Sequence, residues 1–147
     1  MTRAELHGFL TLVDRSALRG LGEALARDLA VRHRSLPQDG LWMLTMCDGV
    51  AGEPFHAGEL PVAEARIEVE DRAGVRAEGG ARLLLAAPED ALAAAICDAV
   101  WSGNLAGSDL VAELAASGRA AAVSRDLRRA AVRESTRVQF ADLGETP

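Results

Sequence analysis

Residues 63–70 alternate without exception between apolar and charged side chains, and this pattern constrains the fold more than any other stretch of the chain. In an extended chain successive side chains point to opposite faces, so the apolar residues share one face and the charged residues share the other. The apolar set is Ala63, Ala65, Ile67 and Val69, and the charged set is Glu64, Arg66, Glu68 and Glu70. The segment therefore predicts a strand with one packed face and one face open to solvent or a partner.

Two further segments have the composition of strands. Residues 41–47 form a short, uncharged, largely apolar run that predicts a buried strand, and residues 81–86 supply a third strand. Turn-forming residues lie between these segments, at Asp48-Gly49 and between Asp71 and Gly74. Connections of this kind favour a small antiparallel meander over residues 41–86.

Apolar residues at helical spacing predict two amphipathic helices before the meander, over residues 2–14 and 16–34. After the meander, Pro88-Glu89-Asp90 predicts a helix start, because proline suits the first turn and acidic groups stabilise the positive end of the helix dipole. We expect this helix to end near Gly103. A further helical region is expected from Ser108 to about Glu134, with a break allowed at Ser117-Gly118, followed by an extended segment over residues 136–143.

The predicted fold is therefore of the α+β class, with two N-terminal helices, a small antiparallel meander, C-terminal helices and a terminal strand or arm. A chain of 147 residues is long enough to bury a core and short of two full domains. We therefore expect one domain over residues 1–147, with helices in 2–34, the meander in 41–86, helices in 88–134 and the arm in 135–147.

The charge and the cysteine content of the chain exclude several classes of protein. A formal net charge of −6 argues against a surface built for nucleic acid or for an anionic membrane. There is no signal-peptide pattern and no apolar run near the roughly 20 residues that a membrane span requires, so we expect a cytoplasmic protein. Cys47 and Cys97 match no redox or secreted disulfide pattern, so both are expected to be reduced, and no histidine close in sequence supports catalysis at Cys47.

The segment Gly-Glu-Pro-Phe-His-Ala-Gly-Glu at residues 52–59 is predicted to be a shaped loop, because its glycines supply backbone freedom and its proline restricts a turn. His56 lies between Glu53 and Glu59, a combination that suits a metal or a general base. One histidine and two carboxylates are an incomplete zinc set, so a structural or solvated His56 is the simpler interpretation and no metal site is predicted. A small metal-dependent enzyme around His56 remains an alternative.

Asp98 is the one charged residue inside an otherwise apolar run, on the alanine and serine side of its predicted helix. That position is expected to let the carboxylate reach solvent or a neighbouring helix dipole, and a functional role stays open. His7 and His33 are expected on helix surfaces, without a role.

Six arginines lie between residues 119 and 137, against two acidic residues, so this segment carries a charge of +4 and the rest of the chain −10. Arg125, Arg129 and Arg133 recur every four residues and would line one stripe of a helix, suited to carboxylate or phosphate. An anion-binding adaptor is therefore one alternative function, and a solvated helix face is the plain alternative. No base-stacking aromatic residues are interleaved with these arginines, so nucleic-acid binding is not expected.

Three motifs occur together in this chain: Gly52 to Glu59 ahead of a strand, Asp98-Ala99 inside an alanine-rich helix, and Thr136-Arg137-Val138-Gln139-Phe140 near the end, with a weaker echo at Thr2-Arg3. In order and spacing they resemble the PhnG family, the G subunits of the carbon-phosphorus lyase core complex of phosphonate metabolism. The chain departs from the family pattern at Glu64, where the family has arginine, at Leu85 to Ala87 and at Ala141. It therefore resembles a divergent member.

The resemblance implies a subunit that supports displacement of adenine from ATP by methylphosphonate, giving ribose 1-methylphosphonate 5-triphosphate. It implies the I subunit as partner and main carrier of catalysis, with the H, J and L subunits also present. ATP with magnesium would be a substrate of the complex, and no cofactor is expected on this chain alone. The residues themselves point the same way, because the chain shows no nucleotide-binding loop and no convincing acid-base pair, so its role is expected to be structural and activating.

No catalytic residue is predicted in this chain. The residues expected to bind partners or to maintain the family motifs are Gly52, Glu53, Phe55, His56, Gly58, Glu59, Asp98, Thr136, Arg137, Val138 and Phe140. The docking surfaces expected from them are the segment 52–59, the charged strand face and the C-terminal arm. Apolar surface reserved for a partner would leave the chain alone poorly stable or self-associating.

Overall fold

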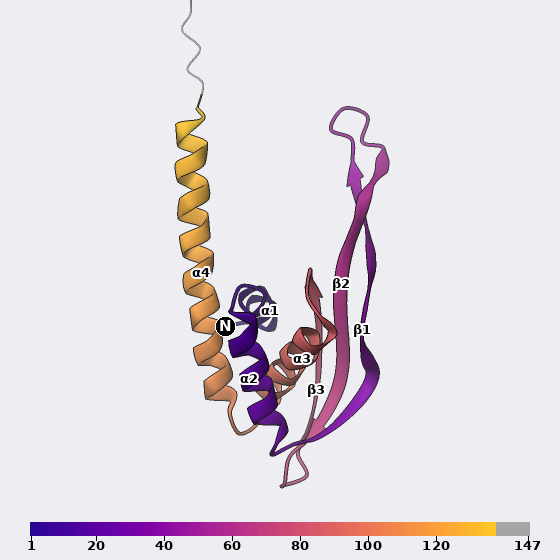
Figure 1. The fold of residues 1–147 in the computed structure, drawn as a ribbon, viewed down its shortest axis with the longest axis vertical. Coiled ribbons are helices and arrows are strands. Elements are labelled where there is room, and N and C mark those ends of the chain that lie inside the picture. Colours follow the sequence, from indigo (N-terminus) through magenta and orange to yellow (C-terminus); the bar gives the residue numbers. More distant parts are fainter. Residues whose placement is uncertain (138–147) are drawn as a thin grey trace, which may run out of the picture.

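The computed structural model describes residues 1–137, and its elements confirm the α+β class. Two N-terminal helices are followed by a three-stranded antiparallel sheet and two C-terminal helices (Figure 1). In chain order the elements are α1 (Arg3–Leu10), α2 (Arg15–Ala26), β1 (Ala30–Cys47), β2 (Pro54–Glu70), β3 (Arg76–Leu84), α3 (Pro88–Ser102) and α4 (Ser108–Ser135). The motif residues Val138 and Phe140 lie outside the described part of the chain.

The sheet has the order β1-β2-β3, and its strands differ greatly in length. β3 pairs with β2 only over residues 62–70, whereas β1 and β2 remain paired as far as Cys47 and Pro54. Beyond β3 the two long strands continue as a two-stranded ribbon, which we call the hairpin arm and define as residues 38–61. Figure 1 shows this arm standing well clear of the helical body.

The second predicted helix was too long. α2 ends at Ala26, and residues predicted as its last turns belong to β1, where Val31 lies opposite Val69 and His33 opposite Ile67. The apolar spacing of residues 18–29 is helical, but strand pairing with β2 outweighs it from Ala30 onward. His33 therefore lies on a strand and not on a helix surface.

Two predictions about the hairpin were also wrong. Residues 41–47 form a strand as predicted, yet the strand is exposed, because within residues 1–137 no third strand and no helix covers it. The segment 52–59 is mostly strand and not a loop, since β2 begins at Pro54 and pairs with β1 through Phe55 and His56. The turn itself occupies residues 48–53.

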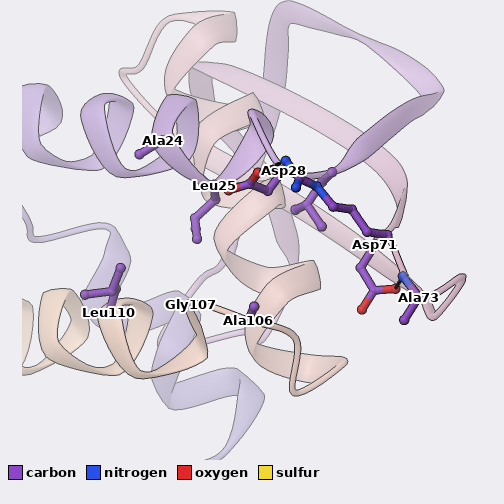
Figure 2. Close-up of a pocket in the computed structure, with 10 residues that line it drawn as sticks. Ala24, Leu25, Asp28, Asp71, Ala73, Ala106, Gly107 and Leu110 are labelled. Atoms are coloured by element: carbon purple, nitrogen blue, oxygen red, sulfur yellow. Dashed lines mark hydrogen bonds and ion pairs between the residues drawn. The ribbon is translucent and has the colours of Figure 1, made fainter.

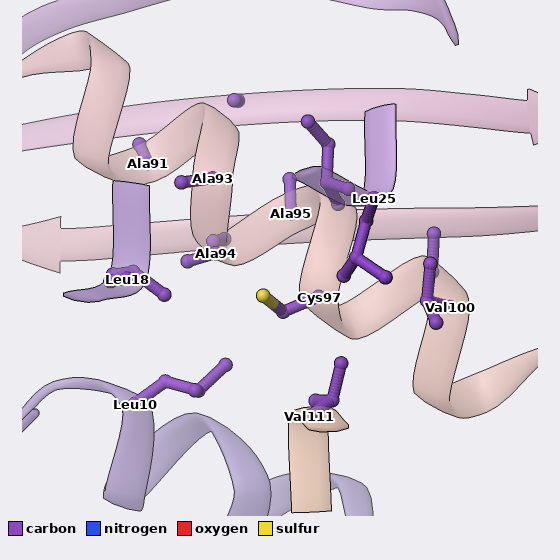
Figure 3. Close-up of a cluster of buried hydrophobic side chains, with 14 of the residues drawn as sticks. Leu10, Leu18, Leu25, Ala91, Ala93, Ala94, Ala95, Cys97, Val100 and Val111 are labelled. Atoms are coloured by element: carbon purple, nitrogen blue, oxygen red, sulfur yellow. The ribbon is translucent and has the colours of Figure 1, made fainter. Parts of the chain in front are cut away.

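The core lies between the sheet and the helices, and α3 is its centre (Figure 3). Side chains from α1, α2 and α4, among them Leu10, Leu18 and Val111, converge on the alanine-rich surface of α3. The opposite side of α3 lies very close to the sheet, because a Cβ at Gly79 of β3 would stand 2.1 Å from the carbonyl oxygen of Ala95. The small residues of α3 thus permit a sheet-helix distance that larger residues would prevent.

α4 is one continuous helix without a break at Ser117-Gly118. Gly118 is buried against α1, and a Cβ there would lie 2.2 Å from the carbonyl oxygen of Phe9. The glycine therefore serves close helix packing and not a helix break. Gly118 is the last buried residue of α4, so we call residues 119–137 the helix arm. Figure 1 shows it projecting past the body on the same side as the hairpin arm.

Candidate functional site

The turn at the end of the hairpin arm is organised by Asp48. Its carboxylate accepts hydrogen bonds from the backbone N–H groups of Val50 and Ala51, both at 3.0 Å, and these bonds lower the pKa of Asp48. Gly52 closes the turn with φ of +71°, a backbone conformation that favours glycine. The backbone conformation therefore explains why glycine stands at the first position of the motif. The turn places Glu53 at the outer end of the arm.

His56 lies in β2 opposite Thr45, and its Nδ1 is 3.2 Å from the Thr45 hydroxyl oxygen. Among residues 1–137 there is no group of three or more histidine, cysteine, aspartate or glutamate side chains that could hold a metal ion. The metal-dependent alternative around His56 thus finds no support in the geometry of the described residues. Phe55 lies opposite Met46, and both side chains are exposed.

The most prominent surface of the molecule is the apolar hairpin arm. Trp42 is 53% exposed and Leu41 is 64% exposed, although large apolar side chains are usually covered in a monomer. From the register and the alternation of the strands, Trp42, Leu44 and Met46 share the face opposite to α3. The large exposed apolar residues of this arm are Leu41, Trp42, Met43, Leu44, Met46, Val50 and Phe55.

The side of the sheet that faces away from α3 becomes charged where β3 joins the sheet. The Arg82 guanidinium lies 5.6 Å from the ring centroid of Trp42 and donates to the Glu64 carboxylate at 2.7 Å. This hydrogen bond, followed by one from Gln38, lowers the pKa of Glu64. Glu64, where the family pattern has arginine, is thus matched by an arginine on the neighbouring strand. The apolar zone around Trp42 and the charged zone around Glu64 form one continuous surface on the side of the sheet that faces away from α3. We call this surface the outer face.

Asp98 is wholly buried, so the expectation that its carboxylate reaches solvent was wrong. Arg3 of α1 donates to both of its oxygens, at 2.7 and 2.5 Å, and His7 lies 3.0 Å away. The N–H of Gly80, on the exposed edge of β3, donates at 2.9 Å. Burial disfavours the carboxylate, but the bonds from His7, Arg3 and Gly80 outweigh that cost and lower the pKa of Asp98 to about 2.

The role of this cluster is to join three elements. Asp98 holds α1 and α3 together. It also accepts from a backbone N–H on the edge of β3, where the described part of the chain has no further strand to accept that hydrogen bond. Sequence reasoning missed Arg3 and His7, which lie four residues apart and so share one face of α1. The weak motif echo at Thr2-Arg3 was the one available signal for this contact.

The arginine stripe lies on the helix arm. Arg125, Arg129 and Arg133 continue the line of buried residues Val111, Ala115 and Gly118, so they face the same side of α4 as the body. Arg125 lies 3.5 Å from the carboxylate of Asp126, and Arg137 lies 3.7 Å from that of Glu134. Thr136 caps the end of α4, with its backbone N–H donating to the carbonyl of Val132.

A pocket of about 570 Å³ opens at the other end of the body, between the end of α2, the β2–β3 turn and the start of α4 (Figure 2). Its wall is largely apolar, with Leu25 and Leu110 on one side, and an exposed ion pair between Asp28 and Arg72 at 2.6 Å borders it. None of the predicted site residues lines this pocket, so it stands apart from the surfaces that carry the family motifs.

A comparison with protein-family models matches residues 1–144 to the family described as phosphonate metabolism protein PhnG. The chain belongs to the PhnG family. The motif segment 52–59, the Asp98 cluster and the helix arm are thus features of a PhnG-family chain, and the protein takes part in phosphonate metabolism. A search of curated proteins found no match. Within residues 1–137, no helix combines the length and apolar character needed to cross a membrane.

Proposed function

We propose that this PhnG-family chain is a structural and activating subunit of the carbon-phosphorus lyase core complex. In this role it supports the displacement of adenine from ATP by methylphosphonate. A phosphonate oxygen bonds to the ribose C1, the bond from C1 to the adenine N9 breaks, and adenine leaves after gaining a proton. Catalytic residues are assigned mainly to the I subunit, and the H, J and L subunits complete the assembly.

The observation that carries this proposal is the apolar hairpin arm. A two-stranded ribbon gains little stability by itself, because few of its side chains are buried. This arm nevertheless carries apolar side chains on both faces, with Trp42 and Met46 on one and Leu41 and Met43 on the other. Such a surface is stabilised when a partner covers it. The arm also contains the motif segment 52–59, which supports assigning partner binding to it.

The outer face is the surface proposed for the I subunit. Its apolar zone around Trp42 would supply the buried centre of an interface, and the ion-paired zone around Glu64 and Arg82 would supply the polar rim. Aromatic and arginine residues are the side chains that most often dominate binding energy at such surfaces. The proposed interface residues therefore follow a chemical order along the strands, from apolar at the end of the arm to charged at the body.

The test is co-expression of this chain with the I, H and L subunits, followed by size-exclusion chromatography and an assay for adenine release from ATP and methylphosphonate. The variant Trp42→Ser/Met46→Ser should lose co-elution and reduce adenine release at least tenfold. Val75→Ser is the matched control, since Val75 is 48% exposed on the β2–β3 turn at the far end of the body. The proposal fails if this chain does not associate, or if adenine release is the same without it.

A further inference from the structure

The two arms carry opposite charges. The hairpin arm, residues 38–61, contains four acidic residues and no arginine or lysine, a charge of −4. The helix arm, residues 119–137, contains six arginines and two acidic residues, a charge of +4. The acidic residues of the hairpin arm are Asp39, Asp48, Glu53 and Glu59. Each arm is therefore a projecting element of one sign, and the two signs match in magnitude.

Both arms also expose apolar side chains. On the helix arm Val123, Leu127 and Val132 are each more than half exposed. Within one molecule the arms do not cover one another, because α4 packs on α1 and α3 and stands apart from the hairpin (Figure 1). The arginine stripe nevertheless faces the side on which the body and the hairpin arm lie, since it continues the buried line of Val111, Ala115 and Gly118. The space beside the stripe thus suits an acidic, partly apolar element.

We infer that this element is the hairpin arm of a second copy of the chain, so that each copy seats its hairpin arm against the helix arm of the other. The sign of the charges decides between the pairings. Contact between two hairpin arms brings −4 against −4, and contact between two helix arms brings +4 against +4, both unfavourable. Contact between the hairpin arm and the arginine stripe brings opposite charges together. It covers apolar surface of the hairpin arm and Val132 beside the stripe, whereas Val123 and Leu127 lie on the far side of the helix.

The reach of the arms agrees with this pairing. The ten residues of β1 within the hairpin arm span roughly 33 Å as a strand, and the helical residues 119–135 span roughly 25 Å. Both arms project from the same side of the body (Figure 1), so a two-fold axis can place each arm of one copy beside the opposite arm of the other. Such an arrangement makes the same contact twice and closes, which gives a dimer and no fibre. One face of each hairpin stays free for another partner.

The experiment is sedimentation equilibrium or light scattering of the purified full-length chain alone, at low and at high salt. A dimer of twice 15.5 kDa is expected, with a dissociation constant that rises with ionic strength because opposite charges drive the contact. The helix variant Arg129→Glu/Arg133→Glu and the hairpin variant Asp39→Arg/Glu59→Arg should each raise the dissociation constant at least tenfold. Each single-arm variant brings its own arm to a net charge of zero. The chain that carries all four substitutions should dimerise more tightly than either single-arm variant, because the substituted positions on the two arms are again opposite in sign, although the net charge of each arm is then zero.

The control Arg27→Glu/Arg72→Glu changes the net charge by the same amount as the helix variant, but at the far end of the body. It should leave the dissociation constant within about twofold. The restored dimer of the four-fold variant excludes misfolding as the cause of the single-arm effects. The inference would be overturned by a monomeric parent chain, by a dimer insensitive to both charge reversals, or by no recovery in the combined variant. The arginine stripe would then be open to another anionic ligand. Because no other subunit is present, these outcomes are separate from those of the complex-assembly experiment.

Discussion

Arg3 and Asp98 form a two-point ion pair across 95 residues of sequence, with guanidinium-to-carboxylate distances of 2.7 and 2.5 Å. The carboxylate is fully buried and the arginine side chain is half exposed. Because the same carboxylate also accepts from the N–H of Gly80, one side chain orders α1, α3 and the edge of β3 together. The motif aspartate of the alanine-rich helix thus acts in this chain as a structural junction.

Removing this junction should be costly. Asp98→Ala leaves the Gly80 N–H and the His7 ring without their shared acceptor, and we expect the free energy of unfolding to fall by about 2–3 kcal/mol at pH 7. Chemical denaturation measures the change. Asp28→Ala is the control, because its pair with Arg72 is exposed on both sides and should cost less than about 0.5 kcal/mol. Equal losses in the two variants would contradict a buried junction at Asp98.

The same carboxylate predicts a pH dependence of stability. The pKa of Asp98 falls from 3.8 to about 2 in the folded protein, so the unfolded chain binds more protons between these values. The stabilisation, about 2 kcal/mol, is therefore present above pH of about 4 and is lost as pH falls toward 2. The difference in unfolding free energy between the parent chain and Asp98→Asn should shrink over this window. A constant difference between pH 4 and pH 2 would argue against the lowered pKa.

Two adjacent glycines in β3 should differ strongly in how much stability is lost on substitution by alanine. A Cβ at Gly79 would meet the carbonyl oxygen of Ala95 at 2.1 Å, whereas at Gly80 the nearest atoms lie at 3.7 Å, an ordinary contact. Gly79→Ala must separate β3 from α3 and is expected to cost about 3 kcal/mol, while Gly80→Ala should change stability by less than about 0.5 kcal/mol. Thermal or chemical unfolding of the two variants distinguishes them, and a mild Gly79→Ala would show that α3 does not lie so close to the sheet.

The two thiols should differ sharply in reactivity. Cys47 is exposed at the end of β1, whereas Cys97 is buried in α3, where burial and then the charge of Asp98 raise its pKa to about 12. Since the thiolate is the reactive form, one thiol per folded chain should react with a disulfide reagent at pH 8, and two after denaturation. Cys47→Ser should abolish the reaction of the folded chain. Rapid labelling of Cys97 in that variant would contradict the packing of α3.

Much of the regular structure follows from short-range pattern. The helix predicted from Pro88 to near Gly103 is α3, which spans Pro88–Ser102, because proline and two acids mark its start whatever packs on it. The alternating residues 63–70 form the part of β2 that lies in the body, and their apolar side chains are in the core. The uneven distribution of charge, too, was visible from residue types alone, and the positively charged segment forms the helix arm.

Other features depend on residues far apart in the chain. Residues 30–34 were expected to complete the second helix, and they became strand because β2 pairs with them across more than thirty positions. The period of the helix alone places Asp98 on the alanine side of α3. That side is buried because α1 packs there and brings Arg3 and His7 to the carboxylate. The exposure of residues 41–47 likewise results from the short reach of β3. Local propensity therefore set the period of each element, while burial, ion pairing and the open arms arose from contacts that no local pattern encodes.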